Sequence, residues 1–287
     1  LAECASGFGS VVSVRNIIEE SIAAARSYLI VQRQGASSGN RRILIVDVGG
    51  GSLDLAVLDV VVGAEARIEI VATGGDRLLG GDDFDDIICD DIIDQVAKKE
   101  KLQHSELVEL IRSNPSDQFR LRQAAEEVKK DFGQSDRFSM TLAGGLLGGQ
   151  TYFADSDVFE EKSRSLRVRI MRHVKRLLSE CEYITLDSTD MARGVNPDFE
   201  AVDAVYCTGG GSRIRYIVRD LADAFGRTKV VVASNPTEAI VEGMLQVPIG
   251  GGDCFRVPYS ITVREVGALV GWEHVVRRAY DLSLIHI

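Results

Sequence analysis

The fold that we predict for this chain is built around Ile43 to Leu58, ILIVDVGGGSLDLAVL. Its first four residues are apolar and mostly β-branched, which is typical of a buried strand, and Asp47 ends that strand. Three glycines then turn the chain, and Leu53 to Leu58 runs back as a second strand. We therefore expect a β-hairpin whose turn is made of glycine.

This turn carries groups that suit a bound anion. Glycine permits positive φ and a close approach of backbone N–H groups, so Gly49 to Gly51 can form an anion-binding nest. Ser52 adds a hydroxyl, while the carboxylates of Asp47 and Asp54 would repel phosphates unless a cation stood between them. The pattern predicts a metal–phosphate site with both aspartates near the metal. The alternative is an ordinary glycine-rich hairpin with an aspartate at its end.

Length and composition set wider limits on the fold and the partners. The 287 residues and an apolar fraction of 45% predict a globular chain with one large domain or two modest ones. A formal charge of −10 argues against a nucleic-acid partner, because phosphate-backbone binding needs a basic face. No run of eighteen apolar residues and no leader-like segment is found, so no membrane partner is expected.

The cysteines indicate the compartment. Five is an odd number, the spacing is wide and no CxxC pair occurs, so we expect free thiols in a reducing compartment rather than a disulfide frame or a zinc site. The sequence therefore predicts a cytoplasmic protein. The five are Cys4, Cys89, Cys181, Cys207 and Cys254.

The first half of the chain also contains a second glycine-and-acid turn. Val12 to Tyr28 is typical of a short strand followed by a helix, and Ala66 to Thr73 of a further strand. Gly74 to Asp86, GGDRLLGGDDFDD, then leads into a helix whose N-terminus favours the negative charge of Asp82 and Asp83. Simple helix capping is the alternative explanation for these two residues.

The middle of the chain predicts a charged helix and a hairpin. Glu126, Lys129 and Lys130 fall on one face of a helix expected from Gln118 to Phe132, although most such faces are merely solvated. Two strands should follow, joined by a glycine-rich turn, and Asp157 should cap a long amphipathic helix. The predicted bounds are Arg137 to Leu142 and Gln150 to Ala154 for the strands, and Asp157 to about Cys181 for the helix.

The closing section repeats the strand–glycine turn pattern of the opening one. Ala201 to Cys207 is typical of a buried strand, Gly209 to Gly211 forms a turn, and Ser212 is expected to begin a helix. Such a unit points backbone N–H groups and a helix dipole at one spot, which suits a phosphate. Because both glycine turns follow buried strands, we expect Gly50 and Gly210 to face the same cleft. A strand at Lys229 to Val232 and a helix from Thr237 to about Gln246 should follow.

Four motifs together resemble one known family. They are DVGGGSLD (Asp47 to Asp54), GGDRLLGGDDFDD (Gly74 to Asp86), TGGGSRI (Thr208 to Ile214) and SNPTEAIVEG (Ser234 to Gly243). In order and spacing they resemble the nucleotide-binding domain of the seventy-kilodalton heat-shock chaperones, over roughly residues 12 to 247. The resemblance implies an α/β, RNase H-like lobe of an actin-like ATPase, with ATP or ADP and Mg²⁺ bound in a cleft between two lobes.

The resemblance also implies roles for single residues. Asp47 resembles the carboxylate that organises the metal and its waters, and Ser52 resembles a hydroxyl residue near the γ-phosphate. Glu20 resembles an acid on the connection between the lobes. Gly49, Gly50 and Gly51 resemble the phosphate loop; Glu126, Lys129 and Lys130 resemble the face that clamps the adenosine; and Gly209, Gly210, Gly211, Ser212 and Arg213 resemble the opposite wall.

The same resemblance implies a domain plan. Residues 1–41 would end the first lobe and connect the lobes, and residues 42–247 would form the second lobe with an inserted α+β subdomain at about 76–155. Residues 248–287 would be a linker and the truncated start of a β-sandwich, and Leu282 to Ile287 resembles foreign sequence. On this plan the chain is a fragment without the first lobe, and we expect it to hydrolyse ATP poorly by itself.

Several positions depart from the family pattern. Ser21 replaces a proline that follows the connecting acid, Lys130 replaces an arginine that stacks on adenine, Gly133 replaces a serine, and Thr237 replaces an aspartate. A lysine cannot stack as a planar guanidinium does, so adenine binding should be weaker than in typical members. These departures favour an atypical, regulatory or ribosome-associated-like chaperone.

Alternatives from other functional classes remain open. One is another member of the actin-like superfamily, such as a sugar kinase or a filament protein, although a sugar kinase would need a sugar pocket and an Asp base in the missing lobe. A degenerate domain that binds nucleotide and partners without turnover is a third possibility. For a chaperone, the family implies unfolded polypeptide, a J-domain co-chaperone and a nucleotide exchange factor as partners.

Overall fold

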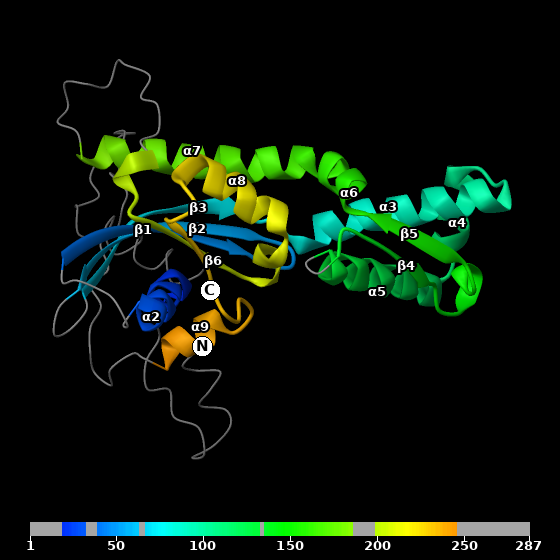
Figure 1. The fold of residues 1–287 in the computed structure, drawn as a ribbon, viewed down its shortest axis with the longest axis horizontal. Helices are drawn as coiled ribbons and strands as arrows, with labels where there is room; N and C mark the ends of the chain where they lie inside the picture. Colours follow the sequence, from blue (N-terminus) through cyan, green and yellow to red (C-terminus); the bar gives the residue numbers. More distant parts are fainter. Residues whose placement is uncertain (1–18, 33–38, 63–66, 133–134, 186–198, 246–287) are drawn as a thin grey trace, which may run out of the picture.

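A five-stranded mixed sheet forms the centre of the computed structural model, which describes residues 19–32, 39–62, 67–132, 135–185 and 199–245 (Figure 1). The strand order is β3-β2-β1-β6-β7, with β1 antiparallel to β2 and β2 antiparallel to β3, whereas β6 is parallel to both β1 and β7. The bounds are Gly39–Val48 for β1, Leu53–Val62 for β2, Arg67–Asp76 for β3, Ala204–Thr208 for β6 and Val230–Val232 for β7.

The glycine-turn hairpin predicted from the sequence is confirmed. Strands β1 and β2 pair in a register that sets Asp47 opposite Asp54, and Ile43 to Val46 are buried. Strand β1 begins earlier than predicted, at Gly39, and Arg42 on this extension forms an ion pair with Asp59 at 2.8 Å. One polar cross-strand pair, Arg42 with Asp59, thus follows directly on the apolar centre of the hairpin.

Helices cover both faces of this sheet (Figure 1). Ile43 and Ile45 of β1 belong to a core cluster with residues of α2 (Glu20–Gln32) and α9 (Ala239–Met244). Leu44 and Val46 point to the opposite face and share a cluster with α7 (Arg164–Thr185) and α8 (Arg215–Phe225). The alternation follows from the two-residue period of a strand, and it explains why β1 is apolar throughout its centre.

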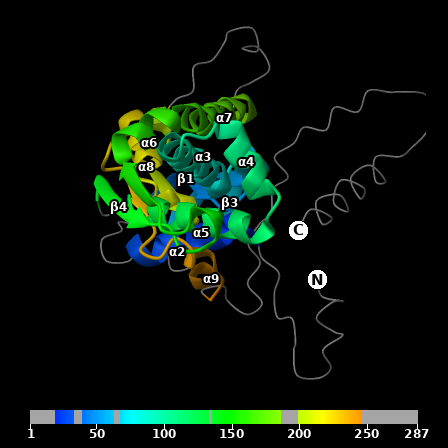
Figure 2. The ribbon, with the colours of Figure 1, turned by 90° about the vertical axis from the view of Figure 1, so that its right-hand side faces the viewer.

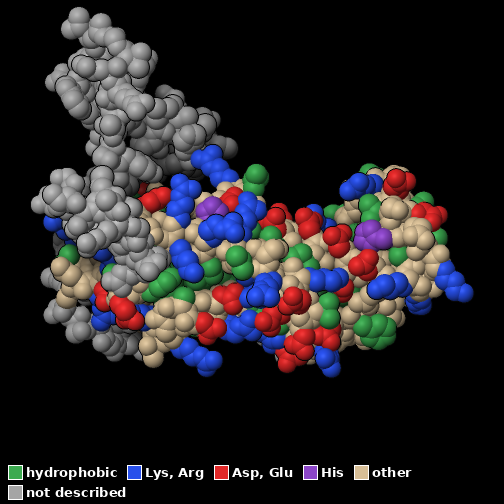
Figure 3. Space-filling view, turned by 90° about the horizontal axis from the view of Figure 1, so that it is seen from above, with side chains coloured by type: hydrophobic (Ala, Val, Ile, Leu, Met, Phe, Trp, Pro, Cys, Tyr) green, Lys and Arg blue, Asp and Glu red, His purple; other side chains and the backbone are tan. Residues whose placement is uncertain are grey.

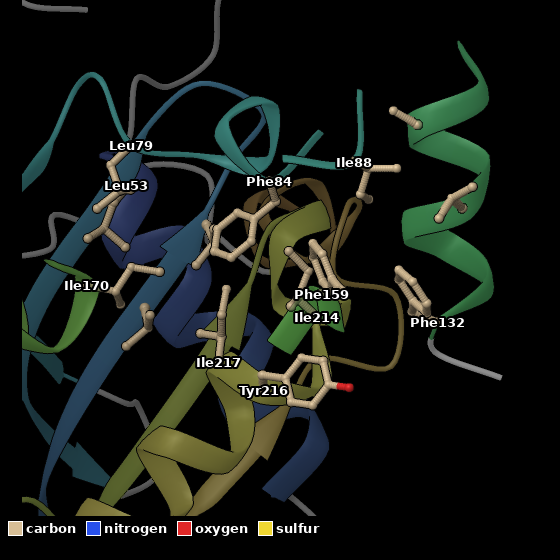
Figure 4. Packing of buried hydrophobic residues seen from close by; sticks show 14 of the residues in the cluster. Leu53, Leu79, Phe84, Ile88, Phe132, Phe159, Ile170, Ile214, Tyr216 and Ile217 are labelled. Atoms are coloured by element: carbon tan, nitrogen blue, oxygen red, sulfur yellow. The ribbon is translucent and has the colours of Figure 1, made fainter. Parts of the chain in front are cut away.

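A second group of elements lies at one end of the sheet (Figure 1), and in the view from that end it stands in front of the sheet (Figure 2). Aromatic side chains join it to the main core, with the ring centroid of Phe159 lying 6.3 Å from that of Phe84, 5.0 Å from that of Phe132 and 6.2 Å from that of Tyr216 (Figure 4). The group comprises α3 (Gly81–Glu100), α4 (His104–Arg112), α5 (Pro115–Asp131) and the hairpin of β4 (Arg137–Thr141) and β5 (Thr151–Asp155).

Several predicted helix bounds were wrong, including the starts of α5 and α9. Asp155, not Asp157, caps the helix after β5, because its Oδ1 accepts a hydrogen bond from the Asp157 amide at 2.9 Å. This helix, α6 (Ser156–Lys162), ends at Ser163, whose hydroxyl donates to the Glu160 carbonyl, and α7 starts anew. The helix after the second glycine turn begins at Arg215 rather than Ser212, and α4 was not predicted.

Some predictions lie outside the described residues. They concern the strand expected at Val12, the segment after Pro248, Gly133, and the thiols of Cys4 and Cys254. Of the helices that the structure describes, none combines the length and apolar character required to cross a bilayer.

Candidate functional site

The two glycine turns meet at one cavity of about 230 Å³, which we call the glycine pocket. The first turn follows β1 and the second follows β6, and these strands are parallel neighbours that end at the same edge of the sheet. The expectation that Gly50 and Gly210 face one cleft is thereby confirmed. Eight of the predicted site residues line the pocket: Gly49, Gly50, Glu126, Lys129, Lys130, Gly210, Gly211 and Arg213.

The N-terminus of α3 holds the first turn in place. The amide of Gly81 donates to the Gly49 carbonyl at 2.9 Å, and that of Asp82 donates to the Gly50 carbonyl at 2.7 Å. A Cβ at Gly80 would lie 2.5 Å from the Gly50 carbonyl oxygen, so the contact requires glycine. Asp83 Oδ2 accepts a hydrogen bond from the Gly80 amide at 2.7 Å, which is the capping role considered as the alternative for this residue.

The second turn is fixed by backbone conformation and by a serine. Gly209 has φ +76°, and a Cβ there would overlap the Val48 carbonyl and the Asp47 carboxylate. Residues 210–213 form a 3₁₀ turn, and the buried Ser212 hydroxyl donates to the Gly209 carbonyl at 2.7 Å. This turn delays the start of α8, so the helix N-terminus lies farther from the glycines than predicted.

Helix α5 supplies the charged wall of the pocket. Lys129 Nζ donates to Asp85 Oδ2 at 2.7 Å and to the Gly81 carbonyl at 3.1 Å, and the Asp85 side chain is only 1% exposed. Burial raises the pKa of Asp85, while the Lys129 ammonium opposes that rise. Lys130 instead pairs loosely with Glu126 at 3.5 Å, and both side chains are exposed. The wall therefore has one fixed cation and a solvated pair at its rim.

This difference predicts unequal effects of two neighbouring substitutions. Lys129→Ala leaves Asp85 buried without its ion-pair partner, so we expect the free energy of unfolding to fall by about 3 kcal/mol. Lys130→Ala removes an exposed i,i+4 pair and should cost less than about 0.5 kcal/mol. Urea unfolding of the two variants side by side measures both values. Equal losses would contradict the described wall.

A second, larger cavity of about 730 Å³ opens beside Asp47, and we call it the acidic pocket. Burial raises the pKa of Asp47 to about 6, and the nearby charges of Glu20 and Asp54 act in the same direction. The Thr208 hydroxyl opposes this rise. Five carboxylate residues line the cavity: Glu19, Glu20, Asp47, Asp54 and Asp76.

Not every predicted residue reaches a pocket. The Ser52 hydroxyl donates to Asp54 Oδ2 at 2.9 Å. Ser212 is occupied within its own turn, as described above. The four predicted residues that line neither the glycine pocket nor the acidic pocket are Gly51, Ser52, Gly209 and Ser212.

Sequence reasoning also missed several residues. Glu19 lines the acidic pocket; burial raises its pKa, and its Oε2 is buried without a hydrogen-bond partner among the described residues, while Ser21 donates to Oε1 at 3.1 Å. Its position beside Glu20 was an available signal. The glycine pocket further includes five residues of the quoted motifs, which are Gly81, Asp82, Asp85, Ile214 and Thr237.

The carboxylates of the acidic pocket suit Mg²⁺ better than they suit a metal ion whose ligands all come from the protein. In the parts of the chain that the structure describes, no three His, Cys, Asp or Glu residues are placed to hold a metal together. Mg²⁺ keeps several waters and commonly uses one or two carboxylates beside substrate phosphates. Asp47 and Asp54, which face each other across the hairpin, supply such a pair.

Comparison with known proteins decides the family. Residues 9–254 match the family model described as Hsp70 protein. The chain belongs to the Hsp70 family. It is 28% identical over 250 residues to heat shock cognate 70 kDa protein 3 of Dictyostelium discoideum, covering 86% of this chain and 36% of that protein. It is 31% identical over 239 residues to a heat shock protein of Pyricularia oryzae, covering 83% of this chain and 35% of that protein.

The family match confirms the resemblance derived from the four motifs. Hsp70 membership implies the actin-like ATPase fold, and the mixed sheet with helices on both faces agrees with the predicted α/β class. The chain spans about a third of the length of these curated Hsp70 relatives. In this Hsp70 chain the first glycine turn separates the two pockets, since Gly49 and Gly50 line one while Asp47 lines the other.

Proposed function

We propose that this chain forms the second lobe of the ATP-binding domain of an Hsp70-type chaperone. The observation that carries the proposal is the glycine pocket, where both glycine turns converge with the charged face of α5. Backbone amides in glycine turns suit phosphate, and the α5 side chains offer polar contacts to a nucleoside. ATP or ADP with Mg²⁺ is the ligand whose chemistry fits both the glycine pocket and the acidic pocket.

Each group has a proposed task in binding. Glu126, Lys129 and Lys130 clamp the adenosine, with Gly210 to Arg213 as the opposite wall and Gly49 to Gly51 next to the phosphates. Asp47 and Asp54 hold Mg²⁺ through its waters, and the ion supplies charge stabilisation to the phosphates when it is bound. Glu20 and Ser52 complete the polar surroundings.

The surroundings of Asp47 set a pH requirement for this role. A carboxylate must be ionised to hold a hydrated cation, and the pKa of Asp47 is raised to about 6 by burial. The group is therefore mainly ionised at neutral pH and becomes protonated as the pH falls through this value. The proposed metal site is thus competent at neutral pH and fails under acid conditions.

For the full-length protein we propose an atypical chaperone in the cytoplasm. The described cysteines Cys89, Cys181 and Cys207 are buried thiols outside any disulfide, which supports a reducing compartment. Ser21, at the position that resembles a coupling proline, supports a regulatory or ribosome-associated-like member. Unfolded polypeptide, a J-domain co-chaperone and a nucleotide exchange factor are the proposed partners. The Hsp70 match favours this function over a sugar kinase or filament protein.

Lys130 offers a direct test of the adenosine clamp. Its side chain is 62% exposed at the rim of the glycine pocket, where a guanidinium could stack on a base. We expect Lys130→Arg in the full-length protein to tighten ATP binding by about threefold to thirtyfold, as measured by calorimetric titration. Lys98→Arg, on an exposed position of α3 away from the pocket, is the matched control and should leave the affinity unchanged. An unchanged affinity in Lys130→Arg would overturn the clamp assignment.

ATP turnover tests the remaining alternative, a domain that binds nucleotide without hydrolysing it. ATP hydrolysis by the full-length protein, with and without a J-domain co-chaperone, distinguishes a chaperone ATPase from a domain that binds nucleotide and does not hydrolyse it. Stimulated hydrolysis is expected. ATP binding without any hydrolysis would assign the degenerate, partner-binding function instead.

A further inference from the structure

Helix α7 is strongly basic in an acidic chain. The segment Arg164 to Arg176 carries six of the 33 Lys and Arg residues, whereas the whole chain has a formal charge of −10. No Asp or Glu occurs on this helix before Glu180. Figure 3 looks down on the α7 side of the molecule and shows Lys and Arg side chains gathered on it.

One side of α7 has its charge neutralised by other elements. Arg167, which is buried, pairs with Asp220 of α8. Arg169 and His173 both contact Asp76 at the end of β3, at 2.6 and 3.0 Å. These contacts attach α7 to the sheet and to α8, so Arg167, Arg169 and His173 have a structural role.

The outer face of α7 has no such partners. Arg164, Arg172 and Lys175 are exposed, and their side chains form no ion pair with any residue that the structure describes. Val168, which is 51% exposed, lies among them. Positions 164, 168, 172 and 175 follow one another at intervals of four, four and three residues and so share one helix face. We call these four residues the α7 ridge.

We propose that the α7 ridge is a docking surface for an acidic polypeptide segment. From Arg164 to Lys175 the helix rises by about 16 Å, so three cations are presented about 5 to 12 Å apart along a straight line. A helical segment with Asp or Glu at matching intervals presents its carboxylates in register with them. A small apolar side chain of that segment would cover Val168.

The observations favour a polypeptide over a nucleic acid. The ridge is only as wide as a single helix, and the carboxylates of Asp76 and Asp220 pair with other residues of α7, outside the ridge. A nucleic-acid site needs a broad basic surface to follow the phosphate backbone, and the chain's net charge of −10 opposes the general attraction of such a polyanion. The exposed valine adds an apolar contact that suits a side chain better than a phosphate.

The test measures binding of a defined peptide to the full-length protein. The probe is a fluorescein-labelled helical peptide of about thirteen alanine-based residues, with three glutamates at intervals of eight and three residues and one leucine four residues after the first glutamate. The ridge variant is Arg164→Gln/Arg172→Gln/Lys175→Gln. The matched control Lys98→Gln/Lys99→Gln/Arg112→Gln removes the same charge from exposed positions on α3 and α4. Fluorescence anisotropy gives each affinity.

We expect the ridge variant to bind the peptide roughly three- to 150-fold more weakly, as expected for losing three exposed charge pairs. The control variant should stay within about twofold of the unmodified protein. A control peptide has glutamine in place of each glutamate. Its affinity for the unmodified protein should be as low as the affinity of the glutamate peptide for the ridge variant. Three outcomes would overturn the proposal: no binding by the unmodified protein, equal losses in both variants, or preferential binding of an oligothymidylate that the ridge variant loses.

Discussion

Asp47→Asn in the full-length protein is expected to lower Mg²⁺-dependent ATP turnover by at least about a hundredfold, while the dissociation constant for ATP changes by less than about threefold. Asparagine keeps the shape and one acceptor oxygen of the side chain, but it has no charge with which to hold a hydrated cation. Single-turnover hydrolysis and calorimetric titration separate the two quantities. Equal losses of binding and turnover would instead assign Asp47 a structural role.

The same substitution should stabilise the fold at neutral pH. Burial raises the pKa of Asp47 from 3.8 to about 6, so the native state holds its proton more tightly than the unfolded chain does. The free energy of unfolding therefore falls as the pH rises from about 4 to 6, and the destabilisation by the buried Asp47 charge is fully present above that range. Asp47→Asn removes a penalty of about 1 to 3 kcal/mol, given that the group is partly solvated.

Urea unfolding at about pH 4 and about pH 8, on either side of that range, provides the check. The variant should gain stability over the unmodified chain at the higher pH and gain little at the lower one. Asp59→Asn, on the same hairpin and with 44% of its side chain exposed, is the comparison that should show no such gain. A variant that is destabilised at the higher pH would mean that the Asp47 charge supports the fold rather than straining it.

Gly209→Ala is expected to lower the free energy of unfolding by about 3 kcal/mol or more. The residue has φ +76°, which an alanine rarely adopts, and the new methyl would overlap the Val48 carbonyl. The adjacent Gly210 is the matched control, since a Cβ there meets only Thr237 Cγ2 at 3.7 Å. Gly210→Ala should cost less than about 1 kcal/mol.

The substitutions Gly209→Ala and Gly210→Ala also separate an effect on folding from an effect on ATP binding. The methyl of Gly210→Ala enters the glycine pocket, so this variant should remain folded while its ATP affinity falls. Thermal unfolding and ATP titration of both variants measure the two effects. If Gly210→Ala bound ATP as the unmodified protein does, the second glycine turn would not contact the nucleotide.

Local patterns were enough to predict the hairpin and the convergence of the two glycine turns. Four consecutive apolar residues at Ile43 to Val46 fit a strand buried on both faces, and the structure has helices on both. Parallel pairing of β1 with β6 then brings two turns that are far apart in sequence to one edge. These features depend on residue periodicity and on glycine, both of which are visible in the sequence.

Other features depend on contacts between distant residues and could not be predicted. The ion pair of Asp85 with Lys129 joins α3 to α5 across 44 positions, and no local pattern distinguishes Lys129 from its neighbour Lys130. The break at Ser163 depends on a serine hydroxyl that competes for a helical carbonyl. The motif residue Thr237 reaches the glycine pocket because the Gly209 amide donates to the Pro236 carbonyl at 3.0 Å.

The hydrogen bonds from α3 to the first glycine turn make two amides natural reporters of site opening. The N–H groups of Gly81 and Asp82 end on the carbonyls of Gly49 and Gly50, so they can exchange with deuterium only when helix and turn separate. Helix α3 belongs to the group of elements at residues 81–155. A displacement of that group and a loosening of the first glycine turn would therefore both expose the same two amide protons. Exchange at Gly81 and Asp82 therefore reads out both movements as a single local equilibrium.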